Sequence, residues 1–487
     1  MFSDLRARFI RTAQELEPTL FERRVSPPAP PSGALHRKLP RNWRFQFDFE
    51  EYCVGEVELR LRFFSHPDAP LRLRFKLAET RYELDRDFDS YDGTLGRGWL
   101  QDGILVLDNP PETVRLPRRY AFRYLELAVE HHSECSNFSI ESVTAITRTS
   151  ADWTRLTPLA AGSELDRKID RIGCRTLAAC MQRVFEDGPK RDRRLWLGDL
   201  RIEAAVNYKT FRNFDLVRRC LYLFAATAAP DGRVPGALFD DPKPTASSQV
   251  FDYAALYPDV LLSYLEVTGD ESTAAELWPV ARRQSELLLD EFDSGGEFRN
   301  KGKLWLFFDW KPELHRTTAA TGITLFALRR TVELARILGR EPEAAFCIPA
   351  AKRLKAWAIR NCFDTARGVF LSGPERQFSW ASQIWMVLAG ALPPEEGRRA
   401  LMTAIAAPEA VGPGCPYLCN QMVQALRSVG ADTEAIRLIR EYWGPMAEAG
   451  LDTFPEVFPA DRPEFSPYGD PVVNSNCHAW SVPPIRV

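Results

Sequence analysis

The chain has 487 residues, of which 45% are hydrophobic, and its formal net charge is -3. These values predict a globular protein of roughly two to four domains that can bury a sizeable core. The near balance of charge offers no basic excess for a phosphate backbone, so we expect no nucleic-acid partner.

The first 42 residues are expected to form a short helix followed by a connector that is rich in proline from residue 24 onward. The helical part lacks the apolar stretch of roughly 7–15 residues that a secretory signal needs. No later segment offers about 18 apolar residues in a row. We therefore predict a cytoplasmic protein with no membrane partner, and a homo-oligomer is left open.

Residues 43–155 show the period-two alternation that is typical of half-buried strands. Leu59 and Leu61 alternate with Arg60 and Arg62, and residues 71–77 repeat the pattern. Turn signals such as NPPE separate these runs. The pattern predicts an antiparallel β-sandwich.

From residue 156 to residue 487 the apolar period changes to 3.6, which indicates helices. Helix-length apolar segments are expected at 165–184, 202–229, 252–267, 272–291, 317–338, 343–361, 378–391, 396–407, 416–429 and 432–446. No solenoid repeat of roughly 34 or 40 residues is present. Helical hairpins that do not stack as a solenoid must close on themselves to bury their apolar faces, so we predict an α/α barrel.

The ten cysteines are scattered along the chain, and several, such as Cys174, Cys180, Cys220 and Cys347, stand in apolar stretches typical of buried thiols. The only close pair, in GCPYLCN, has no second pair at zinc-finger spacing. We predict no metal and no cofactor.

One loop, FEDGPKRDRRLWLGDL, holds three aspartates, a basic cluster and a tryptophan, namely Asp187, Asp192, Asp199, Arg191 and Trp196. Gly188 and Pro189 break any helix before this loop, and Gly198 interrupts any helix after it, so we expect the aspartates on a turn. The plain alternative is that Asp187 and Asp199 cap helices. Asp192 would then pair in water with Arg191 or Arg194. The tryptophan among the acids favours a binding site instead.

A second stretch, GLDTFPEVFP, places Glu456 among aromatic and proline residues, and NSNCHAWS follows with His478. An apolar setting tunes a carboxyl group because it penalises the charged form. The alternative for Glu456 is an exposed loop acid, and the alternative for His478 is a histidine of the core. Two further clusters combine aromatic rings with polar residues: LWLFFDWKP contains Asp309 and Trp310, and QFSWASQIW contains Trp380. Each is equally compatible with a binding site and with aromatic residues of the core.

Acids beside aromatic rings in separate loops are what a carbohydrate site needs, since rings stack on the apolar faces of sugars and carboxylates bind hydroxyl groups. Glycoside hydrolysis requires two carboxyl groups, one that donates a proton and one that is ionised. The helical part therefore predicts a carbohydrate substrate.

The loop DGPKRDRRLWLGD resembles the D-x-P-x-R-[DE]…W-x-G-D signature of the α-L-rhamnosidases of glycoside hydrolase family 78. GLDTFPEVF and NCHAWS are similar to two further segments of that family, and the three occur in the same order. The resemblance covers about residues 43–487. It implies an (α/α)6 barrel behind a β-sandwich and hydrolysis of terminal α-L-rhamnose with inversion of the anomeric centre.

The resemblance also implies roles for single residues. Asp192 falls on the general acid, which is often a glutamate in the family, and Glu456 on the general base. The substrate-binding set is expected to comprise Asp187, Arg191, Trp196, Asp199, Asp309, Trp310, Trp380 and His478. Asp192 must then keep a proton near neutral pH through burial or its acidic neighbours. Arg191 and Arg193 oppose this unless they point away.

Two alternatives stay open from the sequence. The same barrel could hydrolyse a glycoside of another sugar, because a fold does not fix a function. The shorter acid at position 192 also fits a carbohydrate-binding homologue that has lost activity.

Overall fold

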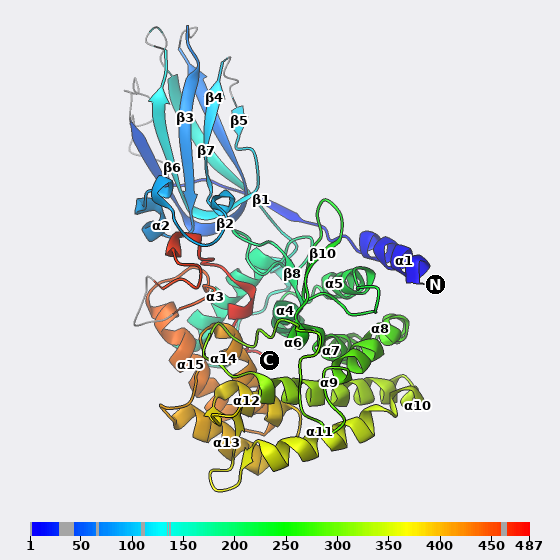
Figure 1. Cartoon of the computed structure of the whole chain (residues 1–487). Helices are drawn as coiled ribbons and strands as arrows, with labels where there is room; N and C mark the ends of the chain where they lie inside the picture. Colours follow the sequence, from blue (N-terminus) through cyan, green and yellow to red (C-terminus); the bar gives the residue numbers. More distant parts are fainter. Residues whose placement is uncertain are drawn as a thin grey trace.

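The computed structural model describes residues 2–28, 43–64, 68–108, 113–133, 135, 138–458 and 465–487. A body of β-strands stands on a helical domain (Figure 1), which is the order of domains expected from the sequence. The first helix, α1 (Phe2–Glu15), packs on α5 (Phe214–Ala226) of the helical domain. Most of the expected proline-rich connector, residues 29–42, lies outside the described residues.

The strands form one antiparallel sheet in the order β1-β7-β2-β6-β3-β4, with β5 paired to β2. Their bounds are β1 (Phe21–Val25), β2 (Arg44–Phe63), β3 (Leu71–Ala78), β4 (Asp102–Leu107), β5 (Thr113–Arg115), β6 (Tyr120–His131) and β7 (Phe138–Thr149). The long strand β2 pairs first with β6 and then with β7, and the register shifts between Asp48 and Cys53, where Glu50 has a φ of 60°. Both parts of β2 thereby contribute to one buried apolar core, with Phe47 from the first and Leu59 from the second.

Strand β1 falls inside the segment that the sequence suggested as helix and connector. Its first four side chains are exposed and only Val25 is buried, so the alternation that reveals a strand is absent there. Pairing with β7 supplies the backbone hydrogen bonds that make it a strand. Between β3 and β4 the chain forms three short helices at the end of the sheet, namely α2 (Arg81–Asp85), η1 (Phe88–Ser90) and η2 (Arg97–Trp99).

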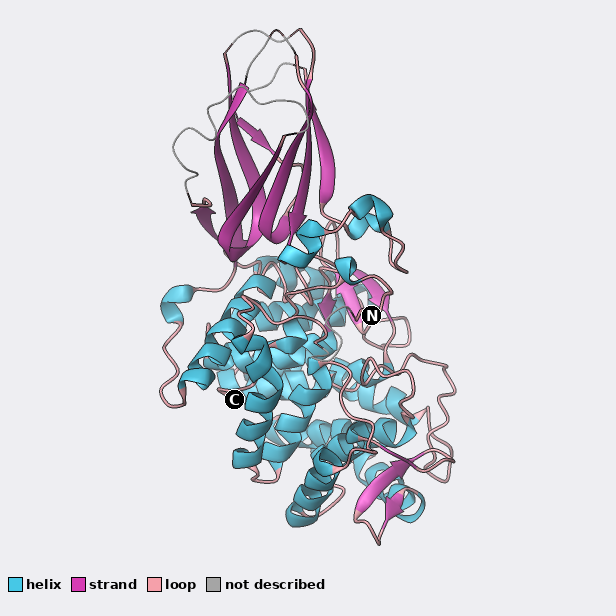
Figure 2. Cartoon of the chain, turned by 90° about the vertical axis from the view of Figure 1, so that its left-hand side faces the viewer, coloured by secondary structure: helices cyan, strands magenta, loops and turns pink. Residues whose placement is uncertain are grey.

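The helical domain is a barrel of hairpins with an inner and an outer ring. The inner helices α4 (Leu197–Lys209), α7 (Tyr257–Thr268), α9 (Thr317–Ile337), α12 (Trp380–Leu388) and α14 (Pro416–Ser428) contact one another in this order, and the short turn η5 (Ala479–Ser481) closes the ring between α14 and α4. The outer helices are α3 (Glu164–Cys180), α5, α8 (Glu271–Leu289), α11 (Cys347–Asn361), α13 (Pro394–Ala406) and α15 (Asp432–Glu448). Figure 2 shows the strands and the helices separated into two bodies, apart from small strand pairs at the barrel rim.

The burial of each helix follows its ring. All nine residues of α12 are buried, whereas α11 buries only the stripe Cys347, Ala350, Leu354 and Ala358. An inner helix is covered on every side, while an outer helix keeps one apolar face and exposes the rest. This difference explains why the outer helices were recognisable from their period.

Two expectations about the helices differ from the structure. The segment expected at 202–229 is divided into α4 and α5, because Arg212 has a φ of 54° and the side chain of Asn213 caps α5. Asp199 lies in the first turn of α4 instead of on a loop. Gly198 does not break this helix but is required there, since a Cβ atom would lie 2.3 Å from the ring of Tyr253.

The remaining elements are short. They are α6 (Phe251–Ala254), α10 (Glu341–Ala344), η3 (Trp153–Arg155), η4 (Pro471–Val473), the sheet of β8 (Leu195–Trp196), β9 (Ala237–Phe239) and β10 (Thr245–Ser248), and the sheet of β11 (Phe363–Asp364), β12 (Val369–Ser372) and β13 (Gln377–Phe378). None of the ten cysteines, all within the described ranges, forms a disulfide, and all except Cys135 are buried, as expected. Across the described ranges, no helix has the length and apolar character needed to cross a bilayer.

Candidate active site

A cavity of about 280 Å³ lies where four segments of the barrel, including the stretch from Ser248 to Tyr253, meet a loop of the strand domain. The loop between α3 and α4 contributes Asp187 to Asp199, the segment after α15 contributes Glu456 to Trp480, and the stretch before α9 contributes Trp305 to Trp310. Leu95 and Trp99 reach it from the strand domain. We call this space the sugar cavity.

The loop before α4 is folded tightly by its own backbone. The Asp187 N–H donates to the Arg194 carbonyl over 3.0 Å, and the Arg194 N–H donates back to Asp187 Oδ1 over 3.1 Å. Gly188 is needed because a Cβ atom there would lie 2.6 Å from Ser475 Oγ. Asp192 and Arg193 both have positive φ, at 65° and 52°. Non-glycine residues in this region are strained, and such strain concentrates at functional sites, so the loop is held in shape by its surroundings.

Glu456 is buried and fixed by contacts on every side. Its N–H donates to the Ser475 carbonyl and its carbonyl accepts from Trp480 Nε1, both over 2.9 Å. One carboxylate oxygen accepts from the Arg191 guanidinium and the other from the Tyr468 hydroxyl. With 1% of its surface exposed, this is not the exposed loop acid of the alternative interpretation.

Arg191 connects the two carboxylates expected to do the chemistry. While it binds Glu456, its Nη1 atom lies 3.5 Å from Asp192 Oδ1, and its Nε donates to the Val473 carbonyl over 3.1 Å. The guanidinium also lies over the Tyr468 ring, 4.4 Å from its centroid. Burial opposes the charge, but Glu456 together with Tyr468 and the neighbouring aspartates outweighs it and raises the pKa of Arg191 above its ordinary value.

The other two arginines of the loop differ in direction. Arg194 Nη2 lies 3.8 Å from Asp192 Oδ1, so Asp192 faces two guanidinium groups. Arg193 points away and donates to the carbonyls of Pro189 and Arg119. Of the two arginines that the sequence marked as opposing a protonated Asp192, only Arg193 therefore turns aside.

Three buried titratable groups surround this pair. Burial, reinforced by the charges of Asp192 and Asp199, raises the pKa of Asp187 well above its usual range. Burial likewise raises the pKa of Asp199, and it lowers the pKa of His478 well below its ordinary value. His478 Nδ1 lies 3.6 Å from Asp199 Oδ1, a contact between groups that both favour their uncharged forms.

The walls of the sugar cavity are largely aromatic. Trp196 meets Tyr253 and Trp305 edge to face at centroid distances of 6.0 and 6.2 Å. Phe307 stacks on Trp480 at 5.5 Å. The ring of Trp310 contacts Phe307 at 5.0 Å and Tyr468 at 5.9 Å. Such rings offer flat apolar surfaces beside the carboxylates.

Several polar atoms of the lining residues have no hydrogen-bond partner. They are Trp196 Nε1, Trp310 Nε1, Arg194 Nε, Asp199 Oδ1 and His478 Nδ1, and all five are buried. Buried polar groups in folded proteins are nearly always paired. A group of unpaired donors and acceptors around one cavity therefore fits a polar ligand with several hydroxyl groups.

The structure brings eight of the ten expected site residues to the sugar cavity and leaves two outside it. Asp309 is 1% exposed, accepts hydrogen bonds from the Gly414 N–H and the Cys415 thiol, and has its pKa raised to about 6 by burial. The Trp380 indole donates to the Ala404 carbonyl within the core. Both side chains use their polar groups inside the barrel and do not line the sugar cavity, and their expected substrate contacts stay predictions.

Some lining residues were missed from the sequence. Tyr468 and Tyr253 stand in segments without a recognisable motif, and Trp99 belongs to the other domain. Trp305 was within a noted aromatic cluster but was not singled out. Asp452, near Glu456 in sequence, points elsewhere and binds Arg123 of β6 over 2.6 Å, which links the barrel to the sheet.

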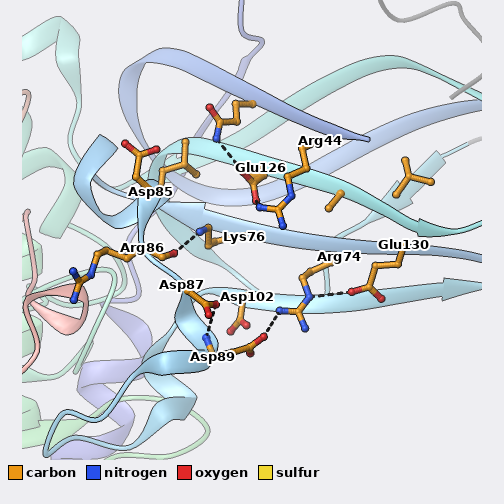
Figure 3. Close-up of a pocket in the computed structure, with 14 residues that line it drawn as sticks. Arg44, Arg74, Lys76, Asp85, Arg86, Asp87, Asp89, Asp102, Glu126 and Glu130 are labelled. Atoms are coloured by element: carbon orange, nitrogen blue, oxygen red, sulfur yellow. Dashed lines mark hydrogen bonds and ion pairs between the residues drawn. The ribbon is translucent and has the colours of Figure 1, made fainter. Parts of the chain in front are cut away.

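Another cavity, of about 670 Å³, lies on the sheet and is shown in Figure 3. Several of its charges are paired: Arg74 binds Asp89 at 2.9 Å and Glu130 at 3.0 Å, and Lys76 donates to the Arg86 carbonyl. No aromatic ring is among the described residues that line it. The described parts of the chain also contain no group of three or more His, Cys, Asp or Glu side chains suited to a metal ion. The sugar cavity is therefore the candidate active site.

Two family models and several solved structures match the chain. Residues 9–147 match the model of the glycosyl hydrolase family 78 alpha-rhamnosidase N-terminal domain, and residues 163–485 match that of the bacterial alpha-L-rhamnosidase 6 hairpin glycosidase domain. The chain is 39% identical to a rhamnosidase from Klebsiella oxytoca solved with rhamnose bound, with a TM-score of 0.93 over 99% of this chain and 98% of that one.

More distant structures share the fold. A family 78 rhamnosidase of Bacillus sp. GL1 is 22% identical, with a TM-score of 0.77 over 91% of this chain and 45% of that one. An α-L-rhamnosidase of Streptomyces avermitilis is 17% identical, with a TM-score of 0.70 over 97% of this chain and 44% of that one. A comparison with curated proteins gives no match.

Proposed function

Because the chain belongs to glycoside hydrolase family 78, we propose that it releases terminal α-L-rhamnose from a glycoside by a single displacement in the sugar cavity. Glu456 acts as the base that takes a proton from the attacking water, and Asp192 acts as the acid that protonates the leaving oxygen. The observation that carries the proposal is that Arg191 binds Glu456 and lies 3.5 Å from Asp192, inside an aromatic cavity with unpaired polar atoms.

The two carboxylates have different surroundings, as two different roles require. Glu456 is buried and keeps its orientation through Arg191 and Tyr468, so that its charge has a fixed partner. The side chain of Asp192 is 18% exposed and stands at the edge of the sugar cavity. The general acid must contact the glycosidic oxygen, which joins the sugar in the cavity to the leaving group outside it, so a position at the edge of the cavity suits this role.

The stereochemical outcome depends on the separation of the two carboxyl groups, which is roughly 6.5–9.5 Å in an inverting pair. The shared contact with Arg191 holds both groups at one cavity, and membership of the family supports inversion. An inverting enzyme needs this room for a water molecule between base and sugar. We therefore propose that the first product is β-L-rhamnose.

The sugar is held by the groups that lack partners in the protein. Asp199 and His478 bind hydroxyl groups at the floor, and the indole N–H groups of Trp196 and Trp310 donate from the walls. Asp187 lies in the same loop as Asp192, and burial together with the charges of Asp192 and Asp199 raises its pKa. The aromatic faces cover the apolar side of the deoxy-sugar.

The direct test is release of p-nitrophenol from p-nitrophenyl α-L-rhamnopyranoside. We expect turnover by the wild type and a loss of roughly 10²–10⁴ in kcat for Glu456→Gln, as for removal of a general base. Asp192→Asn should lose less with this substrate, since p-nitrophenolate leaves with little acid assistance, and more with an alkyl rhamnoside. Glu409→Gln, which alters a surface carboxylate paired with Arg367, is the matched control and should keep full activity.

Proton NMR of the first turnover on the alkyl rhamnoside checks the mechanism, because β-rhamnose should appear before the anomers equilibrate. Initial α-rhamnose would contradict inversion. If the folded wild type cleaves another glycoside but no rhamnoside, the proposed sugar is wrong and the cleaved glycoside identifies the right one. If it binds rhamnose without cleaving any glycoside, the protein is a carbohydrate-binding protein.

A further inference from the structure

Asp192 borders two cavities, not one. On one side is the sugar cavity, and on the other is a cavity of about 530 Å³ whose lining also includes Asp192 and Trp99. We call the latter the seam cavity, because it lies between the two domains. Its walls come from β2 at Glu56, from β7 at Arg148, and from the barrel at Glu186 and Phe239.

The place of a general acid fixes what lies on each side of it. The glycosidic oxygen belongs both to the sugar and to the leaving group, so the acid that protonates this oxygen stands between the two. With the rhamnosyl unit in the sugar cavity, the leaving group extends past Asp192 on its other side. We propose that the seam cavity is the subsite for the leaving group and that it takes a further sugar unit; this inference rests on the function proposed above.

The walls of the seam cavity fit an uncharged, hydroxylated ring. Three ion pairs account for most of its charges: Arg119 with Glu186 at 2.8 Å, Arg148 with Glu56 at 3.1 Å, and Arg183 with Asp240 at 3.0 Å. Asp192, Arg193 and Asp241 also line it, so positive and negative side chains are close to balance. Such a lining does not favour a strongly ionic ligand, while the paired groups can still donate to and accept from hydroxyl groups.

Two aromatic rings supply the stacking surfaces of the seam cavity. Trp99 is half-buried and borders both cavities, and Phe239 is half-buried with the Arg194 guanidinium 4.7 Å from its ring centroid. The seam cavity has nearly twice the volume of the sugar cavity, which leaves room for at least one sugar ring of the leaving group. The substrate class that follows is a rhamnose-terminated disaccharide or a longer glycan end.

The test compares leaving groups that do and do not reach the seam cavity. α-L-Rhamnosyl fluoride loses a single atom and requires only the sugar cavity, whereas rhamnosyl-glucose must place glucose beyond Asp192. Phe239 and Leu20 line the seam cavity but not the sugar cavity. For Phe239→Ala and Leu20→Ala we expect unchanged kcat/KM on the fluoride and a fall of about tenfold or more on rhamnosyl-glucose. Phe64→Ala, which truncates an exposed phenylalanine of the strand domain, is the matched control and should change neither.

Each outcome separates the two proposals. Equal kcat/KM of the variants and the wild type on rhamnosyl-glucose, with the fluoride hydrolysed normally, would overturn the seam cavity as the subsite. If kcat/KM of the variants falls on p-nitrophenyl rhamnoside but not on rhamnosyl-glucose, the seam cavity binds a flat aromatic leaving group and not a sugar unit. Failure of the wild type to hydrolyse the fluoride would instead refute the function proposed for the sugar cavity. If Phe239→Ala loses activity on the fluoride as well, its effect is structural, and the comparison of the two substrates is then made with Leu20→Ala, which alters another wall of the seam cavity.

Discussion

Replacing Arg191 by methionine keeps the length of the side chain and removes its charge, which leaves the Glu456 carboxylate buried without a cation. The two side chains are 3% and 2% exposed, so water does not compensate. Breaking a buried ion pair from one side costs about 3–5 kcal/mol of folding free energy. The lost hydrogen bond to the Val473 carbonyl would cost about 1 kcal/mol by itself, but both losses arise from one side chain and are not additive.

Urea unfolding followed by tryptophan fluorescence measures this cost in the barrel transition of four proteins: the wild type, Arg191→Met, Glu456→Gln and the double variant. We expect Arg191→Met to lose about 3 kcal/mol or more, and the double variant to regain about 2 kcal/mol of that loss because no unpaired charge is left in it. None of the three variants should hydrolyse rhamnosides at a rate close to that of the wild type. A loss below about 1 kcal/mol for Arg191→Met, or no regain in the double variant, would refute the interpretation of this contact as a buried ion pair.

The other predictions concern single side chains. Tyr468→Phe removes the hydroxyl donor to the buried Glu456 carboxylate, so it should cost about 1–3 kcal/mol of stability and also lower kcat, as calorimetry and steady-state kinetics can show; an unchanged kcat would mean that the hydroxyl does not position the base. Glu203 is fully buried with both carboxylate oxygens unpaired, and burial raises its pKa, so the folded state keeps a proton that the unfolded state releases above about pH 4.3. This group therefore costs stability as pH rises, and Glu203→Gln should gain in Tm over the wild type from pH 4 to pH 7; a constant difference would count against it. Trp380→Phe loses the hydrogen bond to the Ala404 carbonyl and should cost about 1 kcal/mol of stability while KM for rhamnosides stays the same, whereas a raised KM would return Trp380 to the site.

The sequence predicted those parts of the fold that depend on local periodicity. Alternation in residues 71–77 and a 3.6 period in the outer helices each report one buried face, so strands and helices could be told apart. Strand β1 could not be found in this way, because its pairing with β7 gives it backbone hydrogen bonds without a buried face. The assignment of Asp199 to a turn was wrong because the effect of Gly198 depends on the ring of Tyr253, which is distant in sequence.

The site shows the same division between local and distant information. Asp192 and Glu456 stand in motifs that could be recognised from the chain, and both line the sugar cavity. Asp309 and Trp380 had the same local signal of an acid or a ring among aromatic residues, yet their polar groups bind Cys415 and Ala404 within the core. A composition of acids and rings does not reveal which side of a helix or loop faces a cavity, since that depends on the neighbouring elements.

The catalytic geometry depends on two segments that are more than 250 residues apart in the sequence. Besides the Arg191 contact with Glu456, the Ala479 N–H donates to the Asp187 carbonyl over 2.7 Å. The turn η5 that contains Ala479 also closes the inner ring between α14 and α4. Closure of the barrel and assembly of the site are therefore one event, and any change that frees the segment from Glu456 to Ser481 should remove activity and barrel stability together.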